Sequence, residues 1–111
     1  MQYDDTNIYQ RCMELIYLAS RLMKSWPPGY AFLSDQLKRA VSSIALNFAE
    51  GYGRQTKREQ RRYFVMARGS ASEVAAILDI GFRFGIVEQD DHEKGRDICD
   101  HLARMLTKFR R

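Results

Sequence analysis

The chain of 111 residues has few of the residues that interrupt helices or cross-link small folds. It contains two prolines, seven glycines and two cysteines, which argues against a turn-rich all-β fold and against a disulfide scaffold. Cys12 and Cys99 lie far apart in apolar stretches without the paired spacing of a zinc site, so we expect two buried free thiols and no metal. The composition therefore predicts a single globular helical domain over residues 1–111.

Long apolar runs are also absent. No stretch reaches the roughly 18 consecutive apolar residues of a membrane span. The opening segment, Met1–Asp5, is acidic, whereas a secretory signal starts with basic and then apolar residues. We therefore expect a cytoplasmic protein without a membrane partner.

Two segments of the N-terminal half carry apolar residues every three or four positions. The first begins near Asp5 or Thr6, either of which is a good N-cap, and ends before Pro27. The second begins at Ser34, another N-cap residue, and is ended by Gly51 and Gly53, because glycine takes the left-handed conformation of a helix end at little cost. The pattern predicts two amphipathic helices joined by one long connection.

The C-terminal half repeats this pattern. Thr56 and Glu59 form a capping box at the start of a third helix that runs to about Phe84, and Gly85 is its expected end. Asp90 and Asp91 are candidate caps of a fourth helix. Four apolar faces and short connections predict an all-α fold, an antiparallel up-and-down four-helix bundle.

Residue patterns that support catalysis are missing from the sequence. His92 and His101 lack an acid at the spacing of a triad or metal site, and the Glu-x-x-His pairs of a di-iron bundle are absent. The segment Gly51-Tyr52-Gly53 lacks the Lys-Ser/Thr ending of a phosphate loop. We therefore predict a non-enzymatic protein with no catalytic residues and no cofactor.

One segment carries the excess positive charge. The formal net charge is +4, and the stretch 54–68 holds six cations against one acid, Glu59. At helical spacing four of these cations line one side of the start of the third helix and two flank them, and together they would attract phosphates. The four are Arg54, Arg58, Arg61 and Arg68, and the flanking residues are Lys57 and Arg62. The predicted nucleic-acid-binding residues are Arg54, Lys57, Arg58, Arg61, Arg62 and Arg68, extended by Lys108, Arg110 and Arg111. The alternative is a solvated charged face without a ligand.

Four polar residues lie near the predicted contact between the second and third helices. They are Asn47, Glu50, Ser70 and Glu73. Ser70 and Glu73 are placed to face Asn47 and to determine the register of the bundle by hydrogen bonds, while Glu50 precedes Arg54 by one turn and predicts an ion pair. A ligand-binding role for this set is the alternative.

The densest pattern lies between residues 33 and 73. It reads Leu33-x-x-Gln36-Leu37-x-Arg39-Ala40-x-x-Ser43-Ile44-x-x-Asn47-x-Ala49-Glu50-Gly51-x-Gly53-Arg54, followed by Glu59, Tyr63-Phe64, Ala67, Gly69-Ser70 and Glu73. In these positions the chain resembles the four-helix bundle family of 23S rRNA intervening-sequence proteins, which includes the accessory variability proteins of diversity-generating retroelements. The resemblance implies a homopentamer, and similarity to the retroelement proteins implies binding of nucleic acid and of a reverse transcriptase.

Two candidate functions emerge from these observations. The first is an oligomeric module that binds RNA or DNA through its basic residues. The second is a protein-interaction scaffold, such as a reverse-transcriptase accessory factor, in which the cations serve solubility or salt bridges between subunits and do not touch nucleic acid.

Overall fold

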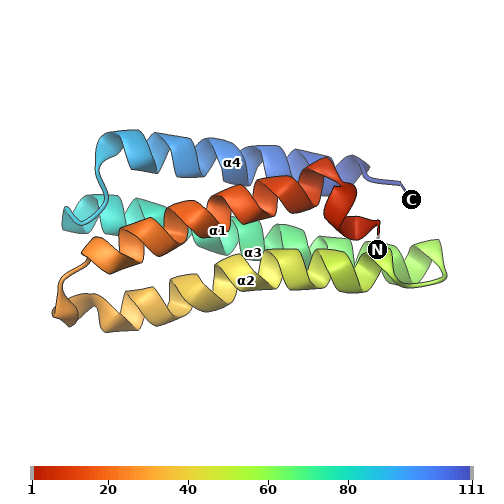
Figure 1. The fold of residues 1–111 in the computed structure, drawn as a ribbon, viewed down its shortest axis with the longest axis horizontal. Coiled ribbons are helices and arrows are strands. Elements are labelled where there is room, and N and C mark those ends of the chain that lie inside the picture. Colours follow the sequence, from red (N-terminus) through yellow and green to blue (C-terminus); the bar gives the residue numbers. More distant parts are fainter. Residues whose placement is uncertain (1, 111) are drawn as a thin grey trace.

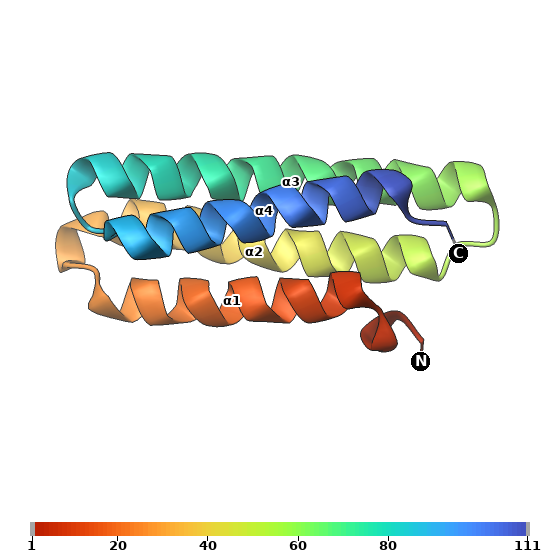
Figure 2. The same cartoon turned by 90° about the horizontal axis from the view of Figure 1, so that it is seen from above.

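Four long helices make up the computed structural model, which describes residues 2–110. Their bounds are α1 (Asn7–Ser25), α2 (Ala31–Tyr52), α3 (Lys57–Phe84) and α4 (Gln89–Lys108), with short 3-10 turns at η1 (Tyr3–Asp5) and η2 (Pro28–Tyr30). Each helix packs against two neighbours, in the cyclic order α1, α2, α3, α4. The helices alternate in direction and form an elongated bundle of 44 × 22 × 21 Å (Figure 1 and Figure 2). The predicted antiparallel four-helix bundle is therefore confirmed.

Three helix boundaries are set by capping chemistry, as predicted. Thr6 Oγ1 accepts a hydrogen bond from the Tyr9 amide at the start of α1, and Thr56 Oγ1 accepts one from the Glu59 amide at the start of α3. Gly85 ends α3 with a φ of 80°, in the left-handed region that glycine enters without steric cost. These predictions needed only local sequence, because each cap involves residues within one turn.

The predicted start of α2 is wrong, whereas its predicted end at Gly51 and Gly53 is confirmed, because the helix ends at Tyr52 and Gly53 is its C-cap residue. The helix begins at Ala31, because the preceding turn η2 already places Ala31 in the helical conformation, so Ser34 lies inside the helix. Gly51 is the penultimate residue of α2, and Gly53 follows the helix with a φ of −81°. Neither glycine is left-handed, so conformational freedom does not explain Gly51.

The predicted start of α4 is also wrong. Glu88 is the N-cap residue and the helix begins at Gln89, which places Asp90 and Asp91 in the first turn. Negative charge there still favours the helix, because the free amides make the N-terminus of a helix partly positive.

The core runs the length of the bundle. Its largest fully buried side chains are Phe48, Leu15, Leu33, Leu37, Ile44, Leu78, Ile98, Leu102, Val74 and Cys12. Gln60 is the buried polar residue of α3, and its side-chain amide donates a 2.8 Å hydrogen bond to the Arg54 carbonyl. Burial raises the pKa of both Cys12 and Cys99 to about 12, so the predicted buried thiols are confirmed. Within residues 2–110, no helix combines the length and apolarity of a membrane span.

Asp79 is the centre of a polar connection between α3 and α4. One carboxylate oxygen lies 2.7 Å from His92 Nε2, and Arg96 Nη1 donates to both oxygens at 2.9 and 3.0 Å. The His92 ring stacks on Phe82 with ring centroids 4.6 Å apart. The hydrogen bonds from His92 and Arg96 hold the pKa of the Asp79 carboxyl below its ordinary value.

We expect this connection to make stability depend on pH. A carboxyl whose pKa is lower in the folded state stabilises the fold above its unfolded pKa of about 4, and the contribution is lost as pH falls through the folded value. Asp79→Asn should therefore lower the free energy of unfolding near pH 7 by at most about 1 kcal/mol, since the side chain is 47% exposed and screened by solvent.

Urea unfolding measured near neutral pH and below about pH 3 tests this prediction. The difference between the native chain and Asp79→Asn should shrink at the lower pH, whereas the exposed control Asp97→Asn should have little effect at either pH. An equal loss at both pH values would contradict the assignment.

Candidate functional site

The six predicted binding cations do not lie on one side of α3. Arg54 lies before the helix, in the connection to α2, because Thr56 is the N-cap residue and α3 begins at Lys57. The other five are on α3, which packs against both α2 and α4 (Figure 1). The expectation of a single basic stripe is therefore wrong, and the cations divide between the two sides.

Arg54 and Arg62 face Tyr63, on the side of α2. Arg54 Nη2 lies 2.6 Å from Glu50 Oε2 and donates a 2.9 Å hydrogen bond to the Tyr63 hydroxyl. The guanidinium carbons of Arg54 and Arg62 lie 4.9 and 5.5 Å from the centroid of the Tyr63 ring. The predicted ion pair between Glu50 and Arg54 is confirmed. These contacts hold Arg54 in a structural role.

Lys57 and Arg61 face the other side, toward α4. With Arg110 they line a cavity of about 310 Å³ between the start of α3 and the end of α4, whose other lining residues include Phe64 and Phe109. We name this hollow the basic cavity. Three cations from two separate segments of the chain thus surround it, an arrangement that attracts anions.

The two remaining cations of the segment differ in their surroundings. Arg68 Nη1 donates a 2.8 Å hydrogen bond to Thr107 Oγ1 on α4, and Arg58 is exposed. Of the six, Arg54 alone forms an ion pair with a carboxylate within residues 2–110. The positive charge of Lys57, Arg58 and Arg61 is therefore not neutralised within this part of the chain.

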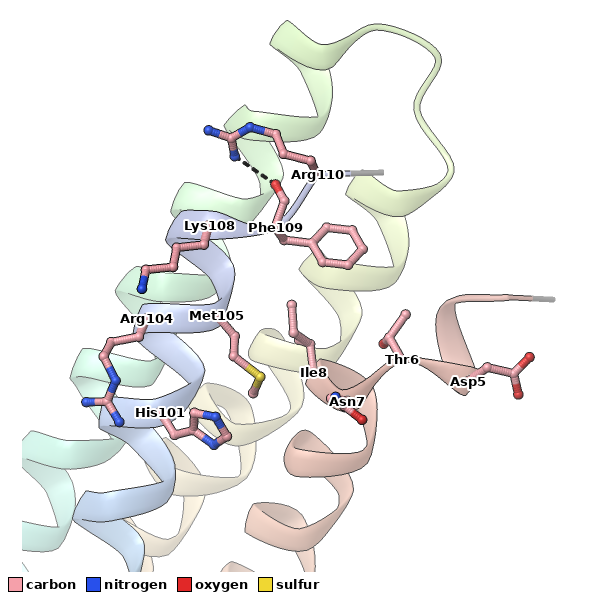
Figure 3. Close-up of a pocket in the computed structure, with 10 residues that line it drawn as sticks. All are labelled: Asp5, Thr6, Asn7, Ile8, His101, Arg104, Met105, Lys108, Phe109 and Arg110. Atoms are coloured by element: carbon pink, nitrogen blue, oxygen red, sulfur yellow. Dashed lines mark hydrogen bonds between the residues drawn. The ribbon is translucent and has the colours of Figure 1, made fainter.

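The cations predicted to extend the binding surface, Lys108, Arg110 and Arg111, do not share one site either. Arg110 belongs to the basic cavity, while Lys108 lines a larger cavity of about 820 Å³ between the end of α4 and the start of α1. Arg104, which the sequence analysis missed, also lines the larger cavity and precedes Lys108 by one turn of the same helix (Figure 3). Arg111 lies outside the described residues.

The polar residues between α2 and α3 are linked through Ser43, which the sequence analysis missed. Asn47 Nδ2 donates to the Ser43 carbonyl at 3.0 Å and to Ser43 Oγ at 2.9 Å, and Ser70 Oγ donates to Ser43 Oγ at 2.8 Å. Glu73 is exposed and Glu50 pairs with Arg54, so neither takes part in this cluster. The signal for Ser43 was its place one turn before Asn47.

Two histidine contacts were also missed. His92 pairs with Asp79 of α3, and His101 Nδ1 accepts a 3.0 Å hydrogen bond from Arg11 Nε of α1. Asp79 and Arg11 belong to other helices than the histidines that they contact, so the spacing of residues along the chain does not predict these contacts. Among residues 2–110, no three His, Cys, Asp or Glu side chains gather as a metal site would require.

The comparisons with known proteins agree with this architecture. The model of the family described as 23S rRNA-intervening sequence protein matches residues 4–108. The fold is similar to the crystal structure of a protein of unknown function from the S23 ribosomal protein family of Bacteroides thetaiotaomicron, with a TM-score of 0.81 and 18% identity over 89% of this chain and 94% of that chain. No curated protein matches. Because the family match spans almost the whole chain, the protein belongs to the family of 23S rRNA-intervening sequence proteins.

Proposed function

We propose that this protein is a non-enzymatic, oligomeric helical bundle that binds RNA or DNA through one basic end. We name as the basic end six exposed cations at the start of α3 and the end of α4: Lys57, Arg58, Arg61, Arg104, Lys108 and Arg110. The observation that carries the proposal is that Lys57, Arg58 and Arg61 have no carboxylate partner within residues 2–110. Lys57 and Arg61 also line the same cavity as Arg110. Such groups bind phosphates and release the counterions that surround a nucleic acid.

Phosphate binding explains the arrangement better than a solvated charged face does. A solvated face needs no hollow, whereas Lys57, Arg61 and Arg110 converge on the basic cavity from two segments of the chain. Arginine suits this role because its planar guanidinium forms two parallel hydrogen bonds with a phosphate group. The proposed oligomer, a pentamer by family resemblance, would repeat the basic end in every subunit and raise affinity for a long strand.

Charge reversal tests the proposal. We expect the triple variant Lys57→Glu, Arg58→Glu, Arg61→Glu to bind mixed-sequence RNA and DNA more than tenfold more weakly, because three phosphate contacts become repulsive. The matched control is Lys24→Glu, Arg83→Glu, Lys94→Glu, which reverses three exposed cations at the opposite end of the bundle. Fluorescence anisotropy with labelled strands measures the affinities, and circular dichroism checks that both variants are helical.

The salt dependence gives a second readout. Replacing the same three residues with glutamine should reduce the slope of log affinity against log salt concentration by about 0.7 to 0.9 for each lost phosphate contact.

The charge-reversal variants also show what would contradict the proposal. If the variant of the basic end and the control variant weaken binding equally, or if neither weakens it, the proposed interface is wrong.

A second candidate function is a protein-interaction scaffold, such as an accessory factor of a reverse transcriptase. It is favoured by large apolar side chains that α2 and α3 expose, including Leu46 at 69% and Phe32 at 56%. Such side chains mark interaction surfaces when they cluster. Protein partners captured from native lysate that survive nuclease treatment, without bound nucleic acid, would favour this function over the first.

A further inference from the structure

A second hollow lies beside the basic cavity, and its lining differs in character. The larger cavity, of about 820 Å³, lies between Asp5–Ile8 at the start of α1 and residues 101–110 at the end of α4. Its volume is in the range of roughly 300 to 1,000 Å³ that small-ligand sites occupy. Phe109 and Arg110 line both cavities, so the two hollows adjoin at these residues.

The lining of the larger cavity separates apolar from charged groups. Ile8, Met105 and Phe109 lie between the ribbons of α1 and α4, while the charged ends of Arg104 and Lys108 lie on the side of α4 away from α1 (Figure 3). Asp5 is the carboxylate of the lining and lies on the opposite wall, near the N-terminus. A ligand with a flat apolar ring and a negatively charged group would therefore bind with the charged group toward α4.

Phe109 is held firmly enough to act as a stacking surface. Its ring packs edge-on against Phe48 and Phe64, with centroids 5.3 and 5.5 Å away, and lies 6.0 Å from Tyr52. Met105 adds a polarisable thioether, which favours contact with aromatic rings. Because Nδ1 of His101 accepts from Arg11, its Nε2 carries a hydrogen that is available to a polar edge of the occupant.

We propose that the larger cavity receives an unpaired base of single-stranded RNA or DNA, whose phosphates lie along Lys108, Arg110 and the basic cavity. A nucleotide has the required apolar plane and anionic end, and bases stack on aromatic side chains without strict sequence preference. A base inside a duplex must first leave its stack to enter such a hollow, whereas an unpaired base avoids that cost. This inference rests on the proposed function and adds that the protein selects single strands.

Obstructing the cavity tests the inference. Asn7 is exposed and lines the larger cavity at the first position of α1, so Asn7→Trp places an indole ring in part of the hollow and leaves every cation in place. The matched control is Gln36→Trp, which adds the same side chain to an exposed position of α2. Anisotropy titrations at about 0.1 M salt compare a short labelled strand with its duplex.

We expect the native chain to bind the single strand about tenfold more tightly than the duplex, which is the typical effect of stacking one base. Asn7→Trp should lose this preference with unchanged duplex affinity, and Gln36→Trp should keep it. Met105→Ala, which removes apolar surface and fills nothing, should also weaken single-strand binding alone.

Three other outcomes would contradict the inference, and each has a different meaning. Equal affinity of the native chain for strand and duplex, or an Asn7→Trp variant that keeps the preference, would exclude base insertion and leave the proposed function intact. Uridine monophosphate bound as tightly as the strand would make the cavity a small-molecule site. A native chain that binds neither strand nor duplex would refute both proposals.

Discussion

Replacing Phe48 with alanine is expected to lower the free energy of unfolding by about 3 to 5 kcal/mol. Phe48 is fully buried at 0% exposure, and its ring packs against Phe64 at 5.6 Å, Phe109 at 5.3 Å and Tyr52 at 5.9 Å. The substitution removes apolar contacts and leaves a void that rings held by α2, α3 and the C-terminal segment cannot fill. Urea unfolding followed by circular dichroism measures the loss.

Two controls separate this effect from ordinary surface substitution. Phe48→Leu keeps most of the volume and should cost less than half as much as alanine. Tyr17→Ala removes an aromatic ring that is 73% exposed and should change stability by no more than about 0.5 kcal/mol. A loss below about 1 kcal/mol for Phe48→Ala would show that this cluster is not a tightly packed core.

The second large effect is expected at Gly51, where Gly51→Val should cost about 3 kcal/mol. A Cβ added at Gly51 would lie 2.8 Å from both Phe64 Cε1 and Tyr63 Cβ and 3.1 Å from the Gln60 carbonyl. Two of these atoms belong to the backbone of α3 or are bonded directly to it, so a rotamer change cannot relieve the overlap. The ends of α2 and α3 must separate instead, which exposes part of the core.

Gly69 supplies the matched control because it lies inside α3 with nothing within 4 Å of an added Cβ. Gly69→Val should leave stability within about 0.5 kcal/mol, since valine is a somewhat better helix former than glycine. The same substitution is thus expected to have very different costs at two glycines. Equal costs in urea unfolding would refute the explanation by close approach of α2 and α3.

The sequence predicted most of the cations of the basic end but not their arrangement. It identified the cations of residues 54–68 and linked them to Arg110, which lies with Lys57 and Arg61 at the basic cavity. It treated them as one stripe along a helix, because spacing gives angular position on a helix but not the positions of neighbouring helices. Arg54 instead contacts Glu50 and Tyr63, a role that separates it from Lys57 and Arg61.

Contacts between helices were the least predictable part of the protein. His92 and Asp79 are 13 residues apart, and Ser43 and Ser70 are 27 apart. Such pairs form only when two helices lie at a particular rotation and register, which depends on how all four apolar faces pack together. The larger cavity has the same origin, since its walls come from opposite ends of the chain.

By itself, the sequence determined the four helices and the caps at Thr6, Thr56 and Gly85, because these depend on interactions within a turn or two of one helix. The tertiary structure alone decided which cations converge on the basic cavity, why Gly51 is glycine and where the larger cavity lies. The physical reason is that helix packing brings together side chains whose separation along the chain carries no local signal.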